Sequence, residues 1–273
     1  MKNISKDVAI SVICNTVSII SLLFASYLLM RMYCVMSFRI PTDSMTPALL
    51  PGDCVLASQL RHDRIDHGDI IFFHFPYPER WDSIANPESG RFYAKRCIGL
   101  PGETLEIRNG HYFIDGEKRD IGNIESQDIL VERLKGIVSD SVARSIGICL
   151  DAWPGHEENP GWTVLNFGPL LIPSKGTTIE INARTWLLYK TLIEWETGTK
   201  KDSISQLCKE QKSDYTFRKN YYFVAGDNTE DSQDSRYWGL LPEDHIRAKG
   251  LFIWKSKDPE THKIRWDRIW KHL

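Results

Sequence analysis

The chain has 273 residues, of which 34 are basic and 36 are acidic. That length suits one large domain or two smaller ones. The near balance of charge excludes a dominant nucleic-acid footprint, which would require a clustered basic excess. The eight histidines form no HExxH pair and the six cysteines form no CxxC pair, so the sequence shows neither a zinc-binding motif nor a redox motif. No disulfide can be assigned from the spacing of the cysteines.

An uncharged stretch of 23 residues, 8–30, opens the chain. As a helix rising about 1.5 Å per residue it would reach about 35 Å, and the hydrocarbon core of a bilayer is about 30 Å thick. We therefore predict a transmembrane anchor. A cleaved signal peptide and a buried core helix are the alternatives, although the run exceeds a usual h-region and no A-x-A site closes it. Basic residues flank the run on both sides, so the positive-inside rule leaves its orientation open.

Short runs of β-branched and aromatic residues follow the anchor and predict strands. Residues 53–58 and 69–75 are bounded by PGD and HGD turns. Asn109-Gly110 lies between two alternating runs within 104–114, and this dipeptide is the strongest short signal of a β-hairpin. The sequence therefore predicts a hairpin there.

The middle of the chain, residues 117–220, has mixed polarity and few long periodic runs. We interpret it as an insertion that carries its own small sheet, with short strands within 166–182 and a short helix over 184–195. Buried strands are predicted again at 221–225 and 246–254.

One hydroxyl, Ser44, stands in a proline-bracketed loop just after the apolar run, in PTDSMTPALLPGD. A serine is a poor nucleophile unless a base takes its proton. No GxSxG elbow surrounds Ser44, and no histidine is singled out by its loop. Lys95, within the apolar run FYAKRCIGL, is a candidate base because burial lowers the pKa of a lysine. An ordinary turn serine and a strand lysine that extends its head to water are the alternatives.

A third polar loop, GDNTEDSQDSRYWG, follows the strand at 221–225. The calcium-loop spacing D-x-[DN]-x-[DN]-G fails at Thr229 and at the missing glycine. A solvated turn with an internal Asp–Arg pair is one interpretation. The functional interpretation gives Ser232 the task of hydrogen bonding and orienting the lysine.

Together these three stretches resemble the boxes of the type I signal peptidase family, the membrane-bound Ser/Lys endopeptidases that remove signal peptides from exported proteins. SMTPALLPGD resembles the nucleophile box, YAKRCIGLPGE the lysine box, and GDNTEDSQDSRYWG the GDNxxxSxDSRxxG box. They occur in the family's order behind an N-terminal anchor.

The resemblance implies that Ser44 is the nucleophile, that Lys95 is the general base and that Ser232 positions the lysine. The backbone N–H of Ser44 would form half of the oxyanion hole. The other donor would be the hydroxyl of Thr42, at a position where much of the family has serine, and threonine adds a methyl group and a stiffer χ1. The residues implied as structural support of the site are Arg96, Asp227, Asp234, Ser235 and Arg236. The residues implied to flank the substrate pockets and the substrate-pairing strand, with ordinary core packing as the alternative, are Ile40, Pro41, Met45, Tyr93 and Ala94.

The predicted fold class is mainly β: an antiparallel β-sheet catalytic domain with an inserted smaller β-containing domain, preceded by one N-terminal transmembrane helix. Its expected divisions are the anchor at 8–30, the first part of the catalytic domain at 36–116, the inserted domain at 117–220, and the second part with the C-terminal segment at 221–273. In that last segment, KIRWDRIWKHL places two tryptophans on one face at helical spacing, which suits an interfacial helix on lipid. A terminal strand or helix packed on the domain is the alternative.

The resemblance further implies cleavage of preproteins at Ala-x-Ala-like sites in the bacterial inner (cytoplasmic) membrane. The N-terminus would be cytoplasmic and the catalytic domain would lie on the periplasmic, or export, side. The expected partners are preprotein signal peptides and the lipid bilayer, with proximity to the secretion translocon and no nucleic acid; no metal or organic cofactor is implied. Two alternatives remain: the self-cleaving repressors of the same Ser/Lys type, which carry a DNA-binding domain where this chain has an anchor, and a catalytically silent membrane-anchored adaptor or binding module.

Overall fold

The computed structural model describes residues 2–59, 64–76, 92–137, 139–150, 152–153, 161–198 and 214–273, without the side chains of 2–10 and 29–33. The helices and 3-10 turns of these residues are α1 (Lys2–Tyr33), α2 (Ile124–Leu134), α3 (Asp140–Ser145), α4 (Ala183–Thr197), η3 (Thr229–Asp231), α6 (Ser235–Trp238), η4 (Glu243–His245) and η5 (Trp266–Arg268). The strands are β1 (Val35–Arg39), β2 (Asp53–Ser58), β3 (Ile70–His74), β4 (Phe92–Gly99), β5 (Thr104–Arg108), β6 (His111–Ile114), β7 (Glu117–Lys118), β8 (Phe167–Leu171), β9 (Thr178–Glu180), β10 (Asp214–Thr216), β11 (Tyr221–Ala225), β12 (Leu241–Pro242) and β13 (Ile246–Ser256).

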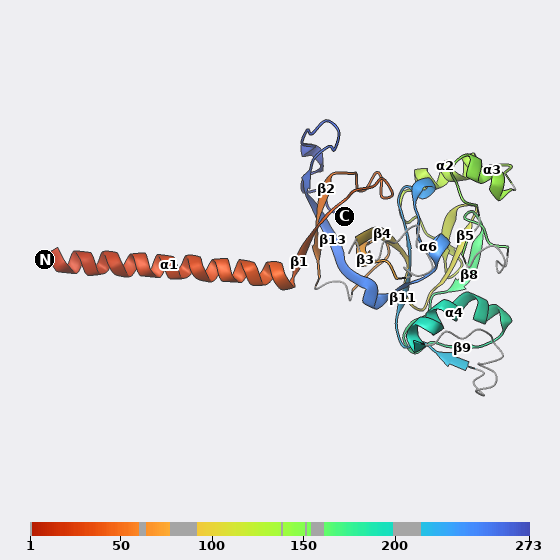
Figure 1. Cartoon of the computed structure of the whole chain (residues 1–273), viewed down its shortest axis with the longest axis horizontal. Helices are drawn as coiled ribbons and strands as arrows, with labels where there is room; N and C mark the ends of the chain where they lie inside the picture. Colours follow the sequence, from red (N-terminus) through yellow and green to blue (C-terminus); the bar gives the residue numbers. More distant parts are fainter. Residues whose placement is uncertain are drawn as a thin grey trace.

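Helix α1 extends away from the rest of the molecule (Figure 1). Its span Ser11–Leu28 has a mean hydropathy of 1.8 and none of it is buried, so it is long and apolar enough to cross a membrane. The buried-core-helix alternative is therefore wrong. Hydroxyls within the span bond back to the helix: Thr16 Oγ1 donates to Val12 O at 2.8 Å and Ser18 Oγ to Cys14 O at 2.9 Å. These bonds satisfy the polar side chains inside an otherwise apolar helix.

An antiparallel seven-stranded sheet, formed by the described residues, has the order β1-β2-β13-β3-β4-β11-β12. The mainly β fold with one N-terminal apolar helix is thereby confirmed. The last strand, β13, lies between β2 and β3, and β11 lies beside β4. This order brings together three segments that are far apart in sequence: the loop between β1 and β2, strand β4, and the loop after β11.

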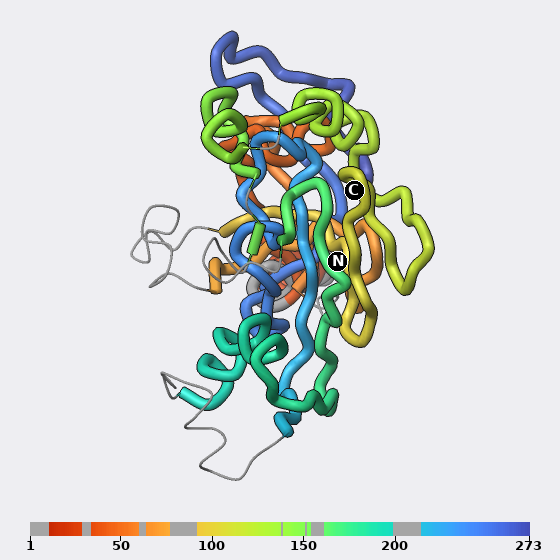
Figure 2. Tube along the Cα trace, turned by 90° about the vertical axis from the view of Figure 1, so that its right-hand side faces the viewer, coloured from red at the N-terminus to blue at the C-terminus, as the bar shows by residue number. Residues whose placement is uncertain are grey.

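A second sheet has the order β7-β6-β5-β8. The predicted hairpin is confirmed, with Arg108 opposite His111 and positive φ angles of 46° at Asn109 and 77° at Gly110. The predicted insertion differs from its expected form, because β8 pairs with β5, which precedes residue 117. Strands β9 and β10 do form a separate pair, and α4 with these strands projects at one end of the molecule (Figure 2). The boundaries at 117 and 220 stay a prediction.

Two apolar clusters hold the sheets. The larger one packs the inner face of the second sheet and α4 against β4 and β11, and includes Leu105, Tyr189 and Phe223. The smaller one lies under β1, β2, β3 and β13, where the rings of Phe38 and Phe72 stack at 4.2 Å between centroids. The loop of Ser44 packs on this smaller cluster through Met45 and Leu49.

The C-terminal segment is not the interfacial helix that its spacing suggests. It forms the single 3-10 turn η5 and then lies along β13, with Trp270 N donating to Ile253 O at 2.7 Å and Ile253 N to Lys271 O at 3.0 Å. Trp266 is 73% exposed and Trp270 68%, whereas Arg268 is 8% exposed. The packed alternative is the one that the structure shows, because backbone pairing to β13 and burial of an arginine determine which side chains face inward.

Candidate active site

Ser44 lies in a loop that the chain closes tightly between β1 and β2. Ile40 N donates to Asp53 O and Gly52 N donates to Ile40 O, both at 2.9 Å. Inside the loop, Met45 and Leu49 are buried in the smaller apolar cluster, and Leu49 N donates to Met45 O at 2.9 Å. These contacts fix the backbone on both sides of Ser44, which is itself half-buried.

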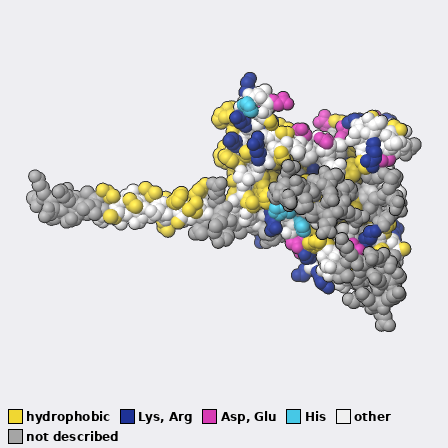
Figure 3. Space-filling view, in the orientation of Figure 1, with side chains coloured by type: hydrophobic (Ala, Val, Ile, Leu, Met, Phe, Trp, Pro, Cys, Tyr) yellow, Lys and Arg dark blue, Asp and Glu magenta, His cyan; other side chains and the backbone are white. Residues whose placement is uncertain are grey.

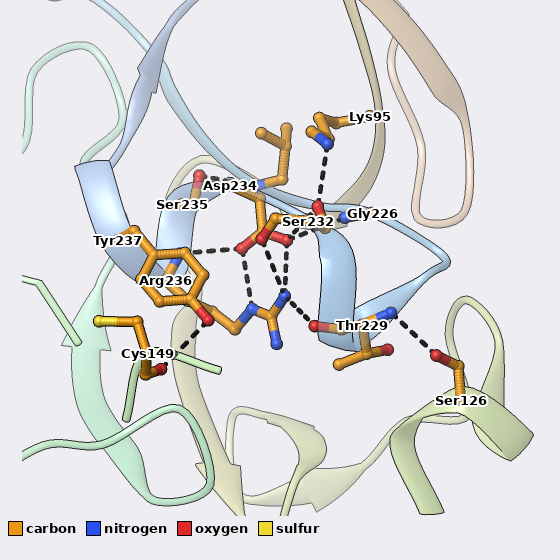
Figure 4. A network of polar contacts seen from close by, with 11 residues as sticks. Lys95, Ser126, Cys149, Gly226, Thr229, Ser232, Asp234, Ser235, Arg236 and Tyr237 are labelled. Carbon is orange, nitrogen blue, oxygen red and sulfur yellow. Dashed lines mark hydrogen bonds and ion pairs between the residues drawn. The ribbon is translucent and has the colours of Figure 1, made fainter. Parts of the chain in front are cut away.

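Lys95 lies on β4, opposite Ile71 of β3, and is 4% exposed. Its Nζ donates to Ser232 Oγ at 2.9 Å (Figure 4). Burial lowers the pKa of Lys95 to about 8; the carboxylate of Asp234 opposes this effect and the guanidinium of Arg236 adds to it. The exposed strand lysine that the sequence left as an alternative is therefore excluded. A lysine with this pKa is neutral in about one molecule in ten at pH 7, far more often than an ordinary lysine.

Ser232 links the lysine to a buried ion pair. Its Oγ accepts from Lys95 and donates to Asp234 Oδ2 at 2.7 Å, so its hydroxyl has a fixed direction. Asp234 in turn accepts from Arg236, with Nε–Oδ1 and NH2–Oδ2 distances of 2.8 Å (Figure 4). Burial alone would raise the pKa of the Asp234 carboxyl, but Arg236 lowers it below its usual range. The charged pair therefore stays charged and holds Ser232.

Gly226 allows the loop of Ser44 and the segment of Ser232 to touch. A Cβ at this position would lie 2.2 Å from Ser232 Oγ and 2.4 Å from the carbonyl oxygen of Ser44. That same carbonyl accepts from Asn228 N at 3.1 Å. The nucleophile candidate and the residue that holds Lys95 are therefore neighbours. Within the described residues, Ser44 Oγ and Lys95 Nζ form no direct hydrogen bond, and such bonds are often long before substrate binds.

A second ion pair, between a partly buried arginine and a buried aspartate, braces the same region. Arg96, next to Lys95, donates to both carboxylate oxygens of Asp227 at 2.7 and 2.5 Å and to Gly68 O at 2.5 Å. Ser235 Oγ accepts from Val224 N at 3.0 Å. Arg96 ties β4 to the loop after β11, and Ser235 ties β11 to α6. These are contacts of the supporting kind that the family resemblance implies.

The predicted oxyanion-hole residue Thr42 and the five predicted pocket residues differ in their burial. Thr42 is exposed, and its hydroxyl makes no hydrogen bond to any residue that the structure describes. Ile40 and Met45 are buried in the smaller cluster, while Tyr93 and Ala94 are half-buried on β4, and Pro41 is exposed. Core packing accounts for the contacts of the two buried residues, and a pocket role for any of the five stays a prediction.

Two groups of residues around the site were missed from the sequence. Ser126 Oγ of α2 accepts from Thr229 N at 2.8 Å, which ties the middle of the chain to the loop after β11. Asp53 pairs with Arg268, at 2.7 Å between Oδ2 and NH2. The PGD turn could have drawn attention to Asp53, but no local pattern names its partner, which lies 215 residues away.

Comparisons with known proteins identify the family of this chain. The model of the signal peptidase family, peptidase S26, matches residues 13–255, so the chain belongs to that peptidase family. Signal peptidase I of Buchnera aphidicola subsp. Baizongia pistaciae is 27% identical over 254 residues, covering 88% of this chain and 77% of that protein. Signal peptidase I of Aquifex aeolicus is 26% identical over 242 residues, covering 86% and 81%. A crystal structure of a signal peptidase I from Enterococcus faecalis is 22% identical, covers 68% of this chain and 95% of its own, and has a TM-score of 0.30.

Proposed function

We propose that this chain is a membrane-anchored serine endopeptidase that removes N-terminal signal peptides from exported preproteins, with Ser44 as nucleophile and Lys95 as general base. The observation that supports this most strongly is a lysine buried on β4 whose pKa is lowered to about 8 and whose Nζ is held by Ser232, beside the loop of Ser44. Relatives that align with most of the chain are named signal peptidase I.

The reaction is acyl transfer in two halves. Neutral Lys95 takes the proton of Ser44 Oγ as that oxygen attacks the scissile carbonyl, and the resulting ammonium gives the proton to the leaving amine. Lys95 then takes a proton from the water that hydrolyses the acyl-enzyme ester. The hydroxyl of Ser232 donates its hydrogen bond to Asp234 and accepts one from an N–H of Lys95, so the lone pair of neutral Lys95 stays free to take the proton of Ser44.

The oxyanion of each tetrahedral intermediate requires two donors. The N–H of Ser44 is one candidate, because it donates to no acceptor within the described part of the chain. The hydroxyl of Thr42, two residues before it, is the other. Its exposure and lack of a partner among the described residues leave it available to turn toward the substrate.

Substrate selection at Ala-x-Ala-like sites would come from shallow pockets that accept small side chains. We place these pockets beside Ile40, Pro41 and Met45 of the nucleophile loop and beside Tyr93 and Ala94 of β4. The support is positional: the first three precede or follow Ser44 in the loop, and the other two precede Lys95 on the strand.

The membrane explains why the nucleophile follows α1 so closely. The helix leads directly into β1 and then into the loop of Ser44. A signal peptide emerging from the bilayer would meet the nucleophile at the membrane surface. The proposed location is the bacterial inner membrane, with a cytoplasmic N-terminus, the catalytic domain on the export side, and the secretion translocon nearby.

Cleavage of a purified preprotein bearing an Ala-x-Ala site, in detergent, tests the proposal. Wild type should cut at that site, and Ser44→Ala and Lys95→Ala should not. Exposed residues of the same types, changed in Ser141→Ala and Lys118→Ala, are the matched controls. An active Lys95→Ala would remove the lysine base from the mechanism. A wild type that is inert on several preproteins would favour the silent adaptor.

A further inference from the structure

The last residues of the chain bury a cation and expose their aromatic rings. Arg268 is 8% exposed, although Trp266 and Trp270 on either side of it are largely exposed. Burying a guanidinium is costly unless it is both paired and hydrogen bonded. The position of Arg268 therefore calls for a specific partner.

That partner is Asp53, which is 0% exposed. Arg268 Nε lies 3.2 and 3.1 Å from the two carboxylate oxygens of Asp53, and NH2 lies 2.7 Å from Oδ2. Ser256 Oγ and Leu50 N also donate to the same carboxylate, at 2.6 and 2.8 Å. Asp53 thus joins three segments: the start of β2, the end of β13 and the C-terminal turn (Figure 1).

The same guanidinium reaches backbone of the nucleophile loop. Arg268 NH2 donates to Ala48 O at 2.8 Å, and Arg265 NH2 donates to Pro51 O at 2.5 Å. These carbonyls follow Ser44 in the loop. On the other side of the loop, the carbonyl of Ser44 accepts from Asn228 N. The loop is therefore fastened both to the segment that carries Ser232 and to the C-terminus.

We propose that Arg268, paired with Asp53, is a positioning residue that holds the loop of Ser44 in the geometry for attack. It acts through backbone and touches neither Lys95 nor Ser232. This inference rests on the proposed function for its kinetic consequence, and on the loop contacts alone for its structural one. A displacement of about 1 Å at a reacting group can cost about 100-fold in rate.

Arg268→Lys is the informative variant. Lysine keeps the positive charge but lacks the planar guanidinium, which donates to Asp53 and to Ala48 O at the same time. For the full chain in detergent, cleaving a preprotein, we expect kcat to fall about 10- to 100-fold while KM stays within about twofold. Each rate is divided by the concentration of folded protein, and the folded fraction of each sample is measured from its thermal melt. Arg247→Lys, on the exposed face of β13, is the matched control and should behave as wild type.

Two kinetic results would overturn the inference. One is a kcat within about twofold of wild type per folded molecule, which would leave the pair a purely structural contact. The other is a raised KM with kcat unchanged, which would point to substrate binding. Should Arg268→Lys fail to fold, Ser256→Ala replaces it and should lower kcat in the same way, because this change removes one bond to Asp53 and one from Arg265 Nε and leaves all the charges in place.

Hydrogen exchange separates this inference from the proposed function. Leu49 N and Leu50 N are bonded within the loop, so their exchange should be faster in Arg268→Lys and unchanged in Arg247→Lys. If wild type cleaves no preprotein but exchange at these amides is faster in Arg268→Lys than in wild type, the proposed function fails and the fastening of the loop stands. If wild type cleaves and exchange does not change, the fastening fails and the proposed function stands.

Discussion

Lys95 has its pKa in the range where the proposed reaction needs the lysine to lose its proton. Burial lowers that pKa to about 8, so the ammonium predominates below this pH and has no lone pair to accept the proton of Ser44. We expect kcat/KM to rise with pH and to reach half of its plateau near pH 8. Steady-state cleavage across this range, with circular dichroism at each pH to show that the protein stays folded, is the measurement. A flat profile would contradict the base assignment.

The same burial should make Lys95 a cost to stability. Because its pKa in the folded protein lies below the ordinary value of 10.5, the unfolded chain binds more protons between about 8 and 10.5. Stability of the wild type should therefore rise with pH in that window. We expect Lys95→Met to be inactive but to melt a few degrees higher than wild type at neutral pH. The difference in melting temperature should shrink as the pH approaches 10.5.

A melting temperature for Lys95→Met that is equal to or below that of wild type at every pH would show that burial of Lys95 does not lower the stability of the fold. The exposed Lys118→Met is the matched comparison, since its side chain is 48% exposed and its substitution should leave the melt and its pH dependence unchanged.

Thr42 can be tested without disturbing the loop. Valine has nearly the shape of threonine and lacks only the hydroxyl, and Thr42 is exposed, so folding should not change. Removing one oxyanion donor typically lowers kcat about 10²–10³-fold. We expect that range for Thr42→Val, with KM little changed and with Thr42→Ser fully active. A loss of less than severalfold in kcat for the valine variant would show that another group supplies the donor.

Local patterns single out Ser44, Lys95 and Ser232, whereas the oxyanion-hole residue Thr42 and the supporting residues were predicted only through the resemblance to the family. Lys95 is conspicuous because a cation interrupts an apolar strand, and Ser232 because it lies in a box of polar residues. The pairing of Asp53 with Arg268 could not be predicted, because it joins residues 215 apart through the position of β13. Contacts of that range depend on the strand order, which hydrophobic periodicity does not determine.

At the scale of elements, the segments with strong turn residues were predicted best. The hairpin of β5 and β6, strand β11, and helix α4 over 184–195 are confirmed. Helices α2 and α3 were not predicted, because two of the buried side chains of α2, Ser126 and Gln127, are polar and interrupt its apolar face, and α3 has only six residues. For the C-terminal segment the sequence left two alternatives, and the structure shows the packed one, because a helical spacing of tryptophans says nothing about the strand edge to which that segment binds.

Helix α2 gives residues 117–220 a role next to the site. Ser126 Oγ accepts from Thr229 N at 2.8 Å, and both residues are buried. Arg133 of the same helix pairs with Glu230, at 2.8 Å between NH1 and Oε2. These contacts reach the segment that carries Ser232, so the middle of the chain supports the lysine-orienting loop from outside.

We predict that Ser126→Ala leaves Thr229 N without its acceptor and loosens this loop. An unsatisfied buried N–H costs about 1–3 kcal/mol, so the melting temperature should fall by several degrees. Because Ser232 would hold Lys95 less firmly, kcat should also fall severalfold per folded molecule. Ser126→Thr, which keeps the hydroxyl, and the exposed Ser141→Ala are the controls. Unchanged kcat in Ser126→Ala would confine α2 to a role in folding.

At the scale of the whole molecule, one edge of the large sheet adjoins the membrane helix. α1 leads directly into the edge strand β1, and Trp254 Nε1 of β13 donates to Ser37 Oγ of β1 at 2.8 Å. Hydrophobic side chains cover the part of the globular region that meets the helix, and Lys and Arg side chains lie on the projection beyond it (Figure 3). Two indoles of the C-terminal segment, Trp266 and Trp270, are also exposed, and the ring of Trp270 packs on Phe252 of β13 at 5.0 Å between centroids.

We predict that these two indoles lie at the membrane surface, because tryptophan prefers the interface between headgroups and hydrocarbon. The measurement is tryptophan fluorescence in vesicles that contain bromine-labelled lipids. The emission of wild type minus that of the double variant Trp266→Phe/Trp270→Phe reports these two rings alone, and phenylalanine keeps the segment apolar. That difference emission should be quenched by the labelled lipid and shifted to the blue relative to unlabelled detergent. The buried Trp162, changed to Phe in a separate variant, should give a difference emission that the lipid does not quench. If the lipid quenches the difference emission of Trp266 and Trp270 no more than that of Trp162, the indoles face water, and α1 alone accounts for contact with the bilayer.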